Sequence, residues 1–295
     1  MKLSIVVFAF IMLFVSVSAQ EDEDIVANGA ELKQAGNTFD FTEGPAVAKD
    51  GSVYFTDQPN DKIYVWDENN GISLYKEGTG RANGMYFNTK GQLVACADGK
   101  NQLIYFDENK TMHVLYEKYD GKLLNGPNDV WIRADGGIYF SDPYFHRDYW
   151  DPARKEEQDK KAVYYMSPDG KVKRIIEDYV MPNGIVGTPD GKTLYVSDMY
   201  GRKIWKYKIE SNGDLTEKTL FVEQGADGMT IDNKGNIYLA LRRVQVYSPE
   251  GKLIKEISVP ETPSNLCFGG KNRNILFITA RKGVYTLEMN VKGVN

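Results

Sequence analysis

Six polar side chains recur at the same place in a repeating pattern along this 295-residue chain. Each begins a short apolar run, which is followed by a Gly-containing turn and then by an alternating apolar segment. All six carry a carboxylate or amide oxygen, and they are Glu43, Asn83, Asn128, Asn183, Asp227 and Asn265. Oxygen ligands of these two kinds bind Ca²⁺ and, less snugly, Mg²⁺ or Mn²⁺. If the fold brings them together, they predict a site for a hard divalent cation.

Six residues cannot all bind one ion, so a smaller ligand set is expected. Two carboxylates, Glu43 and Asp227, balance the charge of a divalent ion, and amides complete its shell without adding repulsion. We therefore predict Glu43, Asn128, Asn183 and Asp227 as the metal ligands. Ca²⁺ is the first choice of ion, and Mg²⁺, Mn²⁺ and Zn²⁺ are alternatives. Two further residues, Asn83 and Asn265, are then candidates for binding substrate.

A simpler explanation is that the recurring residues only make turns. Asn-Gly and Asp-Gly pairs favour tight turns, which would account for Asn83-Gly84 and Asn183-Gly184. The same explanation does not cover Glu43-Gly44. The metal site is therefore the favoured interpretation.

The spacing of the six residues predicts the fold. They lie 40, 45, 55, 44 and 38 residues apart, and each repeat contains three or four short strand-like runs with no helical segment between them. This period predicts an all-β, six-bladed β-propeller whose first strands line a central tunnel. The last repeat has only three strands, so a strand at 30–35 is predicted to close the ring and to cover an exposed edge. An open solenoid would need polar capping repeats, which the sequence lacks.

Composition excludes several classes of function. The net charge is −5 and the chain has no basic block, which argues against nucleic acid or an anionic membrane as a partner. The two histidines, His113 and His146, leave little room for a His-rich zinc site or a His-based triad. Cys96 and Cys267 lie in predicted strands of repeats that are not adjacent, so we expect buried free thiols.

Residues 1–19 are predicted to be a secretory signal peptide. Lys2 is followed by an apolar segment, and Val17-Ser18-Ala19 resembles a small-residue cleavage site. An uncleaved anchor is the alternative. The expected organisation is a signal peptide at 1–19, an acidic leader at 20–29 and the propeller at 30–295. The mature protein is then exported, to the periplasm or the medium, as a monomer or weak oligomer that binds no membrane.

The longest spacing locates an insertion between Asp142 and Val163. The loop after the second strand of a blade emerges on the face where the first strand begins, so the insertion should overhang the six polar residues. An aromatic-rich loop at that position could be a lid, and Tyr144 and His146 are its candidates for contacting substrate. The alternative is a surface loop without a function.

Four aspartates end the predicted second strands of the first four repeats: Asp57, Asp98, Asp142 and Asp198. Their repeated position predicts hydrogen bonds that brace the neighbouring loops, with a secondary role at the site left open.

Five motifs together resemble the SMP-30/gluconolactonase family, and they follow its order along nearly the whole mature chain. They are Phe41-Thr42-Glu43-Gly44-Pro45, Gly126-Pro127-Asn128-Asp129-Val130, Ile138-Tyr139-Phe140-Ser141-Asp142-Pro143, Pro182-Asn183-Gly184-Ile185 and Asp227-Gly228-Met229-Thr230-Ile231-Asp232. The resemblance implies a six-bladed propeller with a divalent metal in its tunnel and ligands at Glu43, Asn128 or its neighbourhood, Asn183 and Asp227. It also implies hydrolysis of sugar lactones or related esters.

The sequence departs from the family pattern at two places. Some sugar lactonases of the family have an arginine where this chain has Gly126, which puts a preference for sugar acids in doubt. The paraoxonase-like branch pairs Asp with Asn and relies on histidines, whereas Asp227 is followed by Gly228 and no histidine pair exists. A phosphotriesterase is therefore disfavoured.

The function predicted from the sequence is that of a metal-dependent lactonase. The ion would polarise the lactone carbonyl, and Asp227 would act as general base toward water or, alternatively, as nucleophile. Two alternatives come from other classes. One is a propeller that serves as an interaction platform with a structural ion, and the other is a sugar-acid binding protein without activity.

Overall fold

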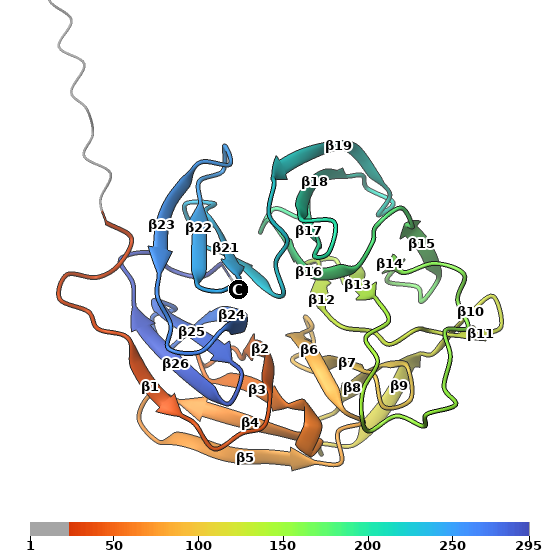
Figure 1. The fold of residues 1–295 in the computed structure, drawn as a ribbon, viewed down its shortest axis with the longest axis horizontal. Coiled ribbons are helices and arrows are strands. Elements are labelled where there is room, and N and C mark those ends of the chain that lie inside the picture. The colour runs from red at the N-terminus through yellow and green to blue at the C-terminus, as the bar shows by residue number, and fades with distance from the viewer. Residues whose placement is uncertain (1–23, 295) are drawn as a thin grey trace, which may run out of the picture.

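The structure, a computed structural model, describes residues 24–294 as a ring of six four-stranded antiparallel sheets around one axis (Figure 1). This confirms the predicted all-β, six-bladed propeller. The predicted signal peptide lies outside the described residues, as do residues 20–23 of the acidic leader. Within residues 24–294 the only helix is the short 3₁₀ helix η1 (Gln58–Asn60), so no helix there is long and apolar enough to cross a membrane.

The first three blades are built from consecutive strands. Blade 1 consists of β2 (Thr42–Val47), β3 (Val53–Asp57), β4 (Lys62–Asp67) and β5 (Gly71–Glu77). Blade 2 consists of β6 (Ala82–Phe87), β7 (Leu93–Ala97), β8 (Gln102–Phe106) and β9 (Met112–Tyr116). A small hairpin follows, made of β10 (Lys118–Tyr119) and β11 (Lys122–Leu123). Blade 3 consists of β12 (Val130–Ile132), β13 (Ile138–Asp142), β14 (Ala162–Met166) and β15 (Val172–Ile176).

The last three blades include one sheet that joins the two ends of the chain. Blade 4 consists of β16 (Pro182–Gly187), β17 (Thr193–Asp198), β18 (Lys203–Ile209) and β19 (Leu215–Val222). Blade 5 consists of β20 (Met229–Ile231), β21 (Ile237–Ala240), β22 (Val244–Tyr247) and β23 (Leu253–Ile257). Blade 6 consists of β24 (Pro263–Gly269), β25 (Ile275–Ala280), β26 (Gly283–Glu288) and, outermost, β1 (Lys33–Gly36). The strand expected at 30–35 is thus observed as β1, which begins three residues later than expected, ends one residue later and pairs with β26.

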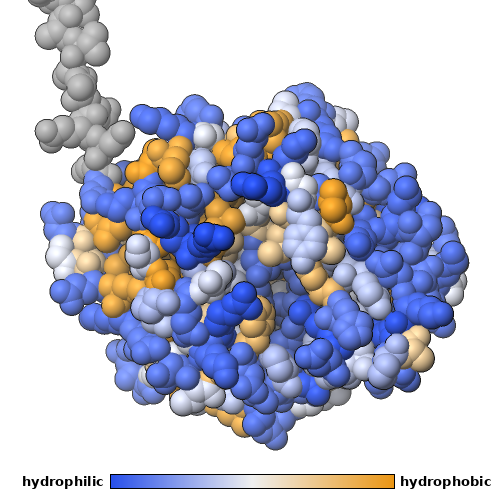
Figure 2. All heavy atoms as spheres, in the orientation of Figure 1, coloured by the Kyte–Doolittle hydropathy of each residue, from blue (hydrophilic) through white to orange (hydrophobic). Residues whose placement is uncertain are grey.

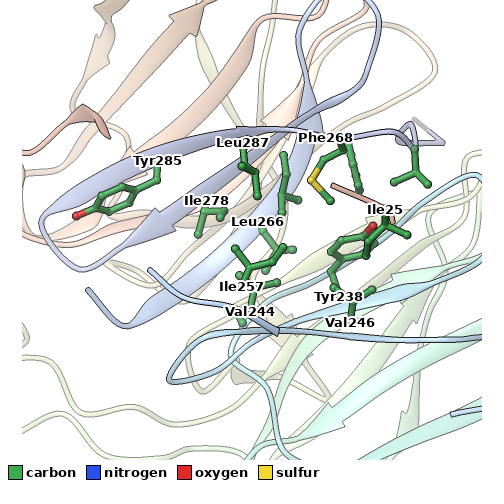
Figure 3. Close-up of a cluster of buried hydrophobic side chains, with 14 of the residues drawn as sticks. Ile25, Tyr238, Val244, Val246, Ile257, Leu266, Phe268, Ile278, Tyr285 and Leu287 are labelled. Carbon is green, nitrogen blue, oxygen red and sulfur yellow. The ribbon is translucent and has the colours of Figure 1, made fainter. Parts of the chain in front are cut away.

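The core lies between neighbouring blades. Between blades 5 and 6, the Tyr238 ring packs edge-on against Phe268 with centroids 5.2 Å apart, and Ile25 joins them (Figure 3). Each large apolar side chain buried in this way contributes roughly 1.5–3 kcal/mol of stability. Cys96 and Cys267 are buried free thiols, as predicted. Figure 2 shows a mainly hydrophilic surface, with hydrophobic residues gathered on the side formed by β23 to β26.

The inner strands are irregular at each of the six recurring polar residues. In blades 3 and 5 the first strand begins only after Asn128 and Asp227. In the other four blades the pairing register shifts there, between Glu43 and Ala46, Ala82 and Met85, Pro182 and Ile185, and Pro263 and Asn265. Such bulges turn a side chain out of the regular alternation of a strand. The six polar residues therefore lie at one mouth of the tunnel, where the inner strands begin.

Candidate active site at one mouth of the tunnel

The six polar residues are linked to one another around the tunnel axis. Asn183 Nδ2 donates a hydrogen bond of 2.8 Å to Asp227 Oδ1, which joins blades 4 and 5. Asn265 Nδ2 donates one of 3.1 Å to Glu43 Oε2, which joins blades 6 and 1. The backbone N–H of Gly84, next to Asn83, donates to the Asn128 carbonyl at 2.8 Å and joins blades 2 and 3. We call the six residues the polar ring.

The glycines of the two Asn-Gly pairs in the ring, Gly84 and Gly184, serve close approach rather than turns. Gly84 and Gly184 lie within β6 and β16 and do not have the positive φ typical of Asn-Gly turns. A Cβ on Gly84 would collide with the backbone of Asn128, and one on Gly184 would collide with the carbonyl of Asp227. The turn explanation of these pairs is therefore wrong. Glycine is required because the neighbouring blade approaches the backbone too closely for a side chain.

Hydrogen bonding within the ring leaves oxygens without donors. Glu43 Oε2 accepts from Gly44 N at 2.6 Å and from Asn265, while Oε1 has no donor among residues 24–294. Asp227 Oδ2 and Asn183 Oδ1 are in the same state, since Asn183 uses only its Nδ2. The buried Asn83 Oδ1 also lacks a partner within the described part of the chain. Of these four oxygens only that of Asn83 is fully buried, and an unsatisfied buried oxygen is rare in native proteins. The free oxygens of Glu43, Asn183 and Asp227 are not fully buried, so they are available to a ligand.

A third carboxylate, Asp129, joins the two predicted ones. It is buried, with 7% of the residue exposed, and its oxygens accept from Val130 N at 2.9 Å and Ile185 N at 3.4 Å. Burial, with a smaller contribution from the charge of Asp227, raises its pKa to about 7. The sequence reasoning missed Asp129 because it follows Asn128, and alternation along a strand would place neighbouring side chains on opposite sides.

The two predicted carboxylates are also harder to ionise than usual. Burial raises the pKa of Asp227 to about 6, opposed by the hydrogen bond from Asn183 and by the charges of Arg147 and Arg281. Burial raises the pKa of Glu43 well above its ordinary value, and repulsion from Asp227 adds to the increase. The charge of the half-buried Asp227 repels both of the buried carboxylates, Glu43 and Asp129, and a cation would relieve this repulsion.

The donor set fits a divalent cation of the calcium type. No three His, Cys, Asp or Glu side chains converge to form a metal site in the described residues. A cation at the ring would therefore depend on amide oxygens as well as carboxylates. Glu43, Asn128, Asn183 and Asp227 supply that mixture, and mixed oxygen ligation suits Ca²⁺.

The insertion extends from blade 2 to blade 4 on the ring side of its own blade. The Arg154 guanidinium donates to the Asp98 carbonyl at 2.9 Å, and the Phe145 ring meets Tyr200 with centroids 6.1 Å apart. Trp150 is buried, and its ring lies against Gly126, two residues before Asn128. The insertion therefore packs against the framework of the ring, in the position expected of a lid.

The two insertion residues expected to contact substrate have different surroundings. The Tyr144 hydroxyl donates a 3.1 Å hydrogen bond to the Arg154 carbonyl, so it helps to hold the insertion together. His146 is exposed, and its contact is with the ring of Trp150, at a centroid distance of 6.4 Å. Of the two pocket candidates in the ring, Asn265 supports Glu43, and Asn83 keeps its free oxygen.

The loop-bracing prediction is confirmed for all four aspartates, three of which bind backbone. In each of these three the carboxylate accepts hydrogen bonds from two successive backbone N–H groups ahead of the first strand of its own blade. The pairs are Asp57 with Asp40 and Phe41, Asp142 with Asn125 and Gly126, and Asp198 with Val180 and Met181. Asp98 differs in its donors, because among residues 24–294 its carboxylate accepts only from side chains, two of which, Arg147 and Tyr149, belong to the insertion loop.

A cavity lies beyond the ring, toward the opposite mouth. It has a volume of about 740 Å³ and reaches from Gly44, Asp129 and Asn265 down to the turns where the inner strands end, at Lys49 and Gly91. The propeller thus has a polar mouth beside the insertion and a cavity that opens toward the other end.

A six-bladed propeller with an acid–amide ring in its tunnel defines the class of protein. A family model for the SMP-30/gluconolactonase/LRE-like region matches residues 41–282, and the chain belongs to that family. The sequence is 31% identical to a gluconolactonase of Zymomonas mobilis over 293 residues, which covers 89% of this chain and 82% of that protein.

Two solved structures share the architecture. A candidate gluconolactonase solved by X-ray crystallography has a TM-score of 0.85 at 30% identity, covering 92% of this chain and 96% of its own. The gluconolactonase XC5397 of Xanthomonas campestris has a TM-score of 0.84 at 27% identity, covering 90% and 91%. These similarities support a lactonase-type hydrolase, the class predicted from the sequence.

Proposed function

We propose that this protein is a metal-dependent lactonase that works at the tunnel mouth beside the insertion. The observation that supports this most is the set of unpaired oxygens on Glu43, Asn183 and Asp227, together at one end of the tunnel. The similarity to gluconolactonases over most of the chain supports a lactone as the substrate.

Glu43, Asn128, Asn183 and Asp227 are the residues proposed to hold the ion. Ca²⁺ is the ion we expect, and when bound it supplies Lewis-acid polarisation of the lactone carbonyl. The hydrogen bonds from Asn265 to Glu43 and from Asn183 to Asp227 orient both carboxylates before any ligand arrives. Such outer partners fix ligand geometry and raise affinity.

Asp227 is the proposed general base. One of its oxygens is fixed by Asn183, which leaves the other to take a proton from water. Its pKa of about 6 in the free protein means that it is ionised at neutral pH and still basic. Water then adds to the lactone carbonyl carbon, the ring C–O bond breaks, and the proton ends on the ring oxygen, which becomes the hydroxyl of the hydroxy acid. If Asp227 attacked directly, it would form a mixed anhydride with the opened acyl group, and water would then hydrolyse that anhydride at the Asp227 carboxyl carbon. A single turnover in ¹⁸O-water would then label Asp227 and leave the product unlabelled, whereas general-base catalysis labels the product in the first turnover.

The experiment that tests the proposal is hydrolysis of aldonolactones, homoserine lactones and aryl esters by the mature protein. Activity is measured with and without chelator, and Ca²⁺, Mg²⁺, Mn²⁺ or Zn²⁺ is then restored in turn. We expect lactone opening that disappears with chelator and returns with one ion. A protein that turns over nothing while an ion raises its melting temperature would contradict the lactonase and favour a binding protein.

We also propose that the protein is exported after removal of residues 1–19. The support is the sequence pattern alone: Lys2, an apolar segment and Val17-Ser18-Ala19. N-terminal sequencing of the secreted or periplasmic protein should begin at Gln20. A mature protein that keeps Met1 would contradict the proposal.

A further inference from the structure

Blade 2 departs from the repeat in the way its first strand is braced. In blades 1, 3 and 4 the aspartate at the end of the second strand binds the backbone ahead of the first. In blade 2 that backbone is bound by Asp61, whose Oδ1 accepts from Thr79 N at 2.9 Å and from Arg81 N at 2.7 Å. Asp98, the residue at the repeat position, is therefore available for another role.

Asp98 uses its carboxylate to hold the insertion. Its Oδ2 accepts from Arg147 Nε and from Gln58 Nε2, both at 2.9 Å, and its Oδ1 accepts from the Tyr149 hydroxyl at 2.7 Å. The Asp98 side chain is only 2% exposed. Burial raises the pKa of Asp98, and the charge of Arg147 opposes that increase. A buried carboxylate with three side-chain donors fixes the position of Arg147 closely.

Only one of the three guanidinium nitrogens of Arg147 is used in this arrangement. No hydrogen bond to Nη1 or Nη2 exists within residues 24–294, and the side chain is 21% exposed. The geometry places Arg147 on the side of the polar ring, because Asp98 holds it directly after β7 and the Trp150 ring of the same insertion lies against Gly126, two residues before Asn128. The effect of its charge on the pKa of Asp227 agrees with this position. The Arg147 guanidinium also lies over the Phe145 ring, at 5.5 Å. Arg154, from the same insertion, stacks over the Trp150 ring at 3.3 Å, donates through Nη1 to the Asp98 and Gly99 carbonyls, and has a buried Nη2. Arg154 thus holds the loop, whereas Arg147 presents free donors.

We propose that Arg147, positioned by Asp98, determines substrate specificity by binding paired oxygen acceptors of the lactone, away from the carbonyl that is attacked. The inference rests on the proposed lactonase function. Two terminal guanidinium nitrogens match a pair of acceptors such as neighbouring hydroxyls or a carboxylate. The site would then select hydroxylated or carboxylated lactones over alkyl lactones. An arginine from the insertion would do this where Gly126 offers no side chain.

The test compares kcat and KM for three six-membered or related lactones: glucono-δ-lactone, a glucarolactone and unsubstituted δ-valerolactone. Arg147→Gln should raise KM for the first two by about 10–100-fold, because the donors of a charged group are lost while kcat depends on other residues. KM for δ-valerolactone should stay within about twofold, since that lactone has no paired acceptors. A larger increase in KM for glucono-δ-lactone would identify hydroxyls as the preferred partner of Arg147, and a larger increase for the glucarolactone would identify a carboxylate.

Arg281→Gln is the matched control. Arg281 also lowers the pKa of Asp227, and its guanidinium lies over the Phe41 ring at 5.5 Å, as that of Arg147 lies over Phe145. It differs from Arg147 because no carboxylate among residues 24–294 binds it. This variant should leave all three KM values within about twofold, which separates specific binding from a loss of positive charge. Asp98→Asn should change KM in the same direction as Arg147→Gln and by less, because Arg147 remains but is less well held.

Two results would overturn the inference. An equal increase in KM for δ-valerolactone and glucono-δ-lactone in Arg147→Gln, or no increase for either, would show that Arg147 does not bind the substituents of the lactone. If Arg147→Gln melts much lower than the unmodified protein, Arg147→Lys keeps the charge and should still raise KM for the hydroxylated lactone. An unmodified protein that opens none of the lactones would overturn the proposed function and this inference together, whereas an active protein indifferent to Arg147 would overturn this inference alone.

Discussion

The two mouths of the tunnel differ in both shape and chemistry. The mouth beside the insertion holds Glu43 and Asp227, whose pKa values are raised by burial. The opposite mouth opens into the cavity of about 740 Å³, where most of the lining comes from the inner strands and their turns. The proposed ion and substrate site therefore lies where the inner strands are irregular, and this cavity lies where they are regular. The proposal thus locates the chemistry by the strand bulges rather than by the cavity.

The largest expected effect is a loss of kcat/KM that occurs for a substitution at one mouth and not for a substitution at the other. Asp227→Asn should lower kcat/KM for the best lactone by about 10³-fold, because the amide cannot take a proton and binds a cation less well. The fold should remain, since the amide has the same shape and can still pair with Asn183. Thr89→Ala, at the opposite mouth, is the control and should leave kcat/KM within about twofold. Full activity of Asp227→Asn in a steady-state assay would refute the assignment of the base.

The pH dependence of ion binding sharpens the comparison. In the ion-free protein the pKa values of Asp227 and Asp129 are about 6 and about 7. Below these values the carboxyls are protonated and neutral, and above them they are charged. Affinity for Ca²⁺ should therefore increase with pH, by about tenfold or more between pH 5.5 and 7.5, because ligands must lose their protons to bind. Calorimetric titrations at several pH values measure this, and a flat profile would place the ion away from the ring.

The smallest expected effects come from two glycine substitutions, one at each mouth, which change the free energy of unfolding. An Ala side chain at Gly84 would meet the Asn128 backbone and should lower the free energy of unfolding by about 1–3 kcal/mol. Gly91, in a turn at the other mouth, has open space but a φ of +76°, so Gly91→Ala should cost about 1 kcal/mol through backbone strain. Only Gly84→Ala should also weaken Ca²⁺ binding. Denaturant unfolding and calorimetry distinguish the two variants, and equal ion affinity in both would argue against a rigid ring.

Much of this architecture could be predicted because each blade repeats the same order of polar residue, turn and alternating strands. The register of Glu43, Asn83 and Asn183 in the repeats indicated one ring, and the short alternating strands between them predicted blades. Asp142 and Asp198 brace their loops as their repeated position predicted. Repetition makes such residues visible in one sequence, because each copy confirms the role of the others.

The residues that could not be predicted are those without a counterpart in the repeat. Asp129 lies beside the polar ring, next to Asn128, because β12 begins only at Val130 and strand alternation does not apply to Asp129. Arg147 belongs to an insertion that occurs once, and its partner Asp98 braces this insertion rather than the backbone of its own blade. The role of Asp98 becomes visible only when Asp61 is seen to bind the backbone of blade 2.

The most direct test of the polar ring as an ion site is calorimetric titration of chelator-treated protein with Ca²⁺, comparing the unmodified chain with Glu43→Gln. Glu43→Gln keeps the size of the side chain and its contact with Asn265 but removes one of the carboxylates. We expect one binding site in the unmodified protein and an affinity lower by about 10–100-fold in the variant, the loss typical when a metal site is altered. Unchanged affinity in Glu43→Gln, with the fold intact by circular dichroism, would show that the ring at this mouth does not hold the ion.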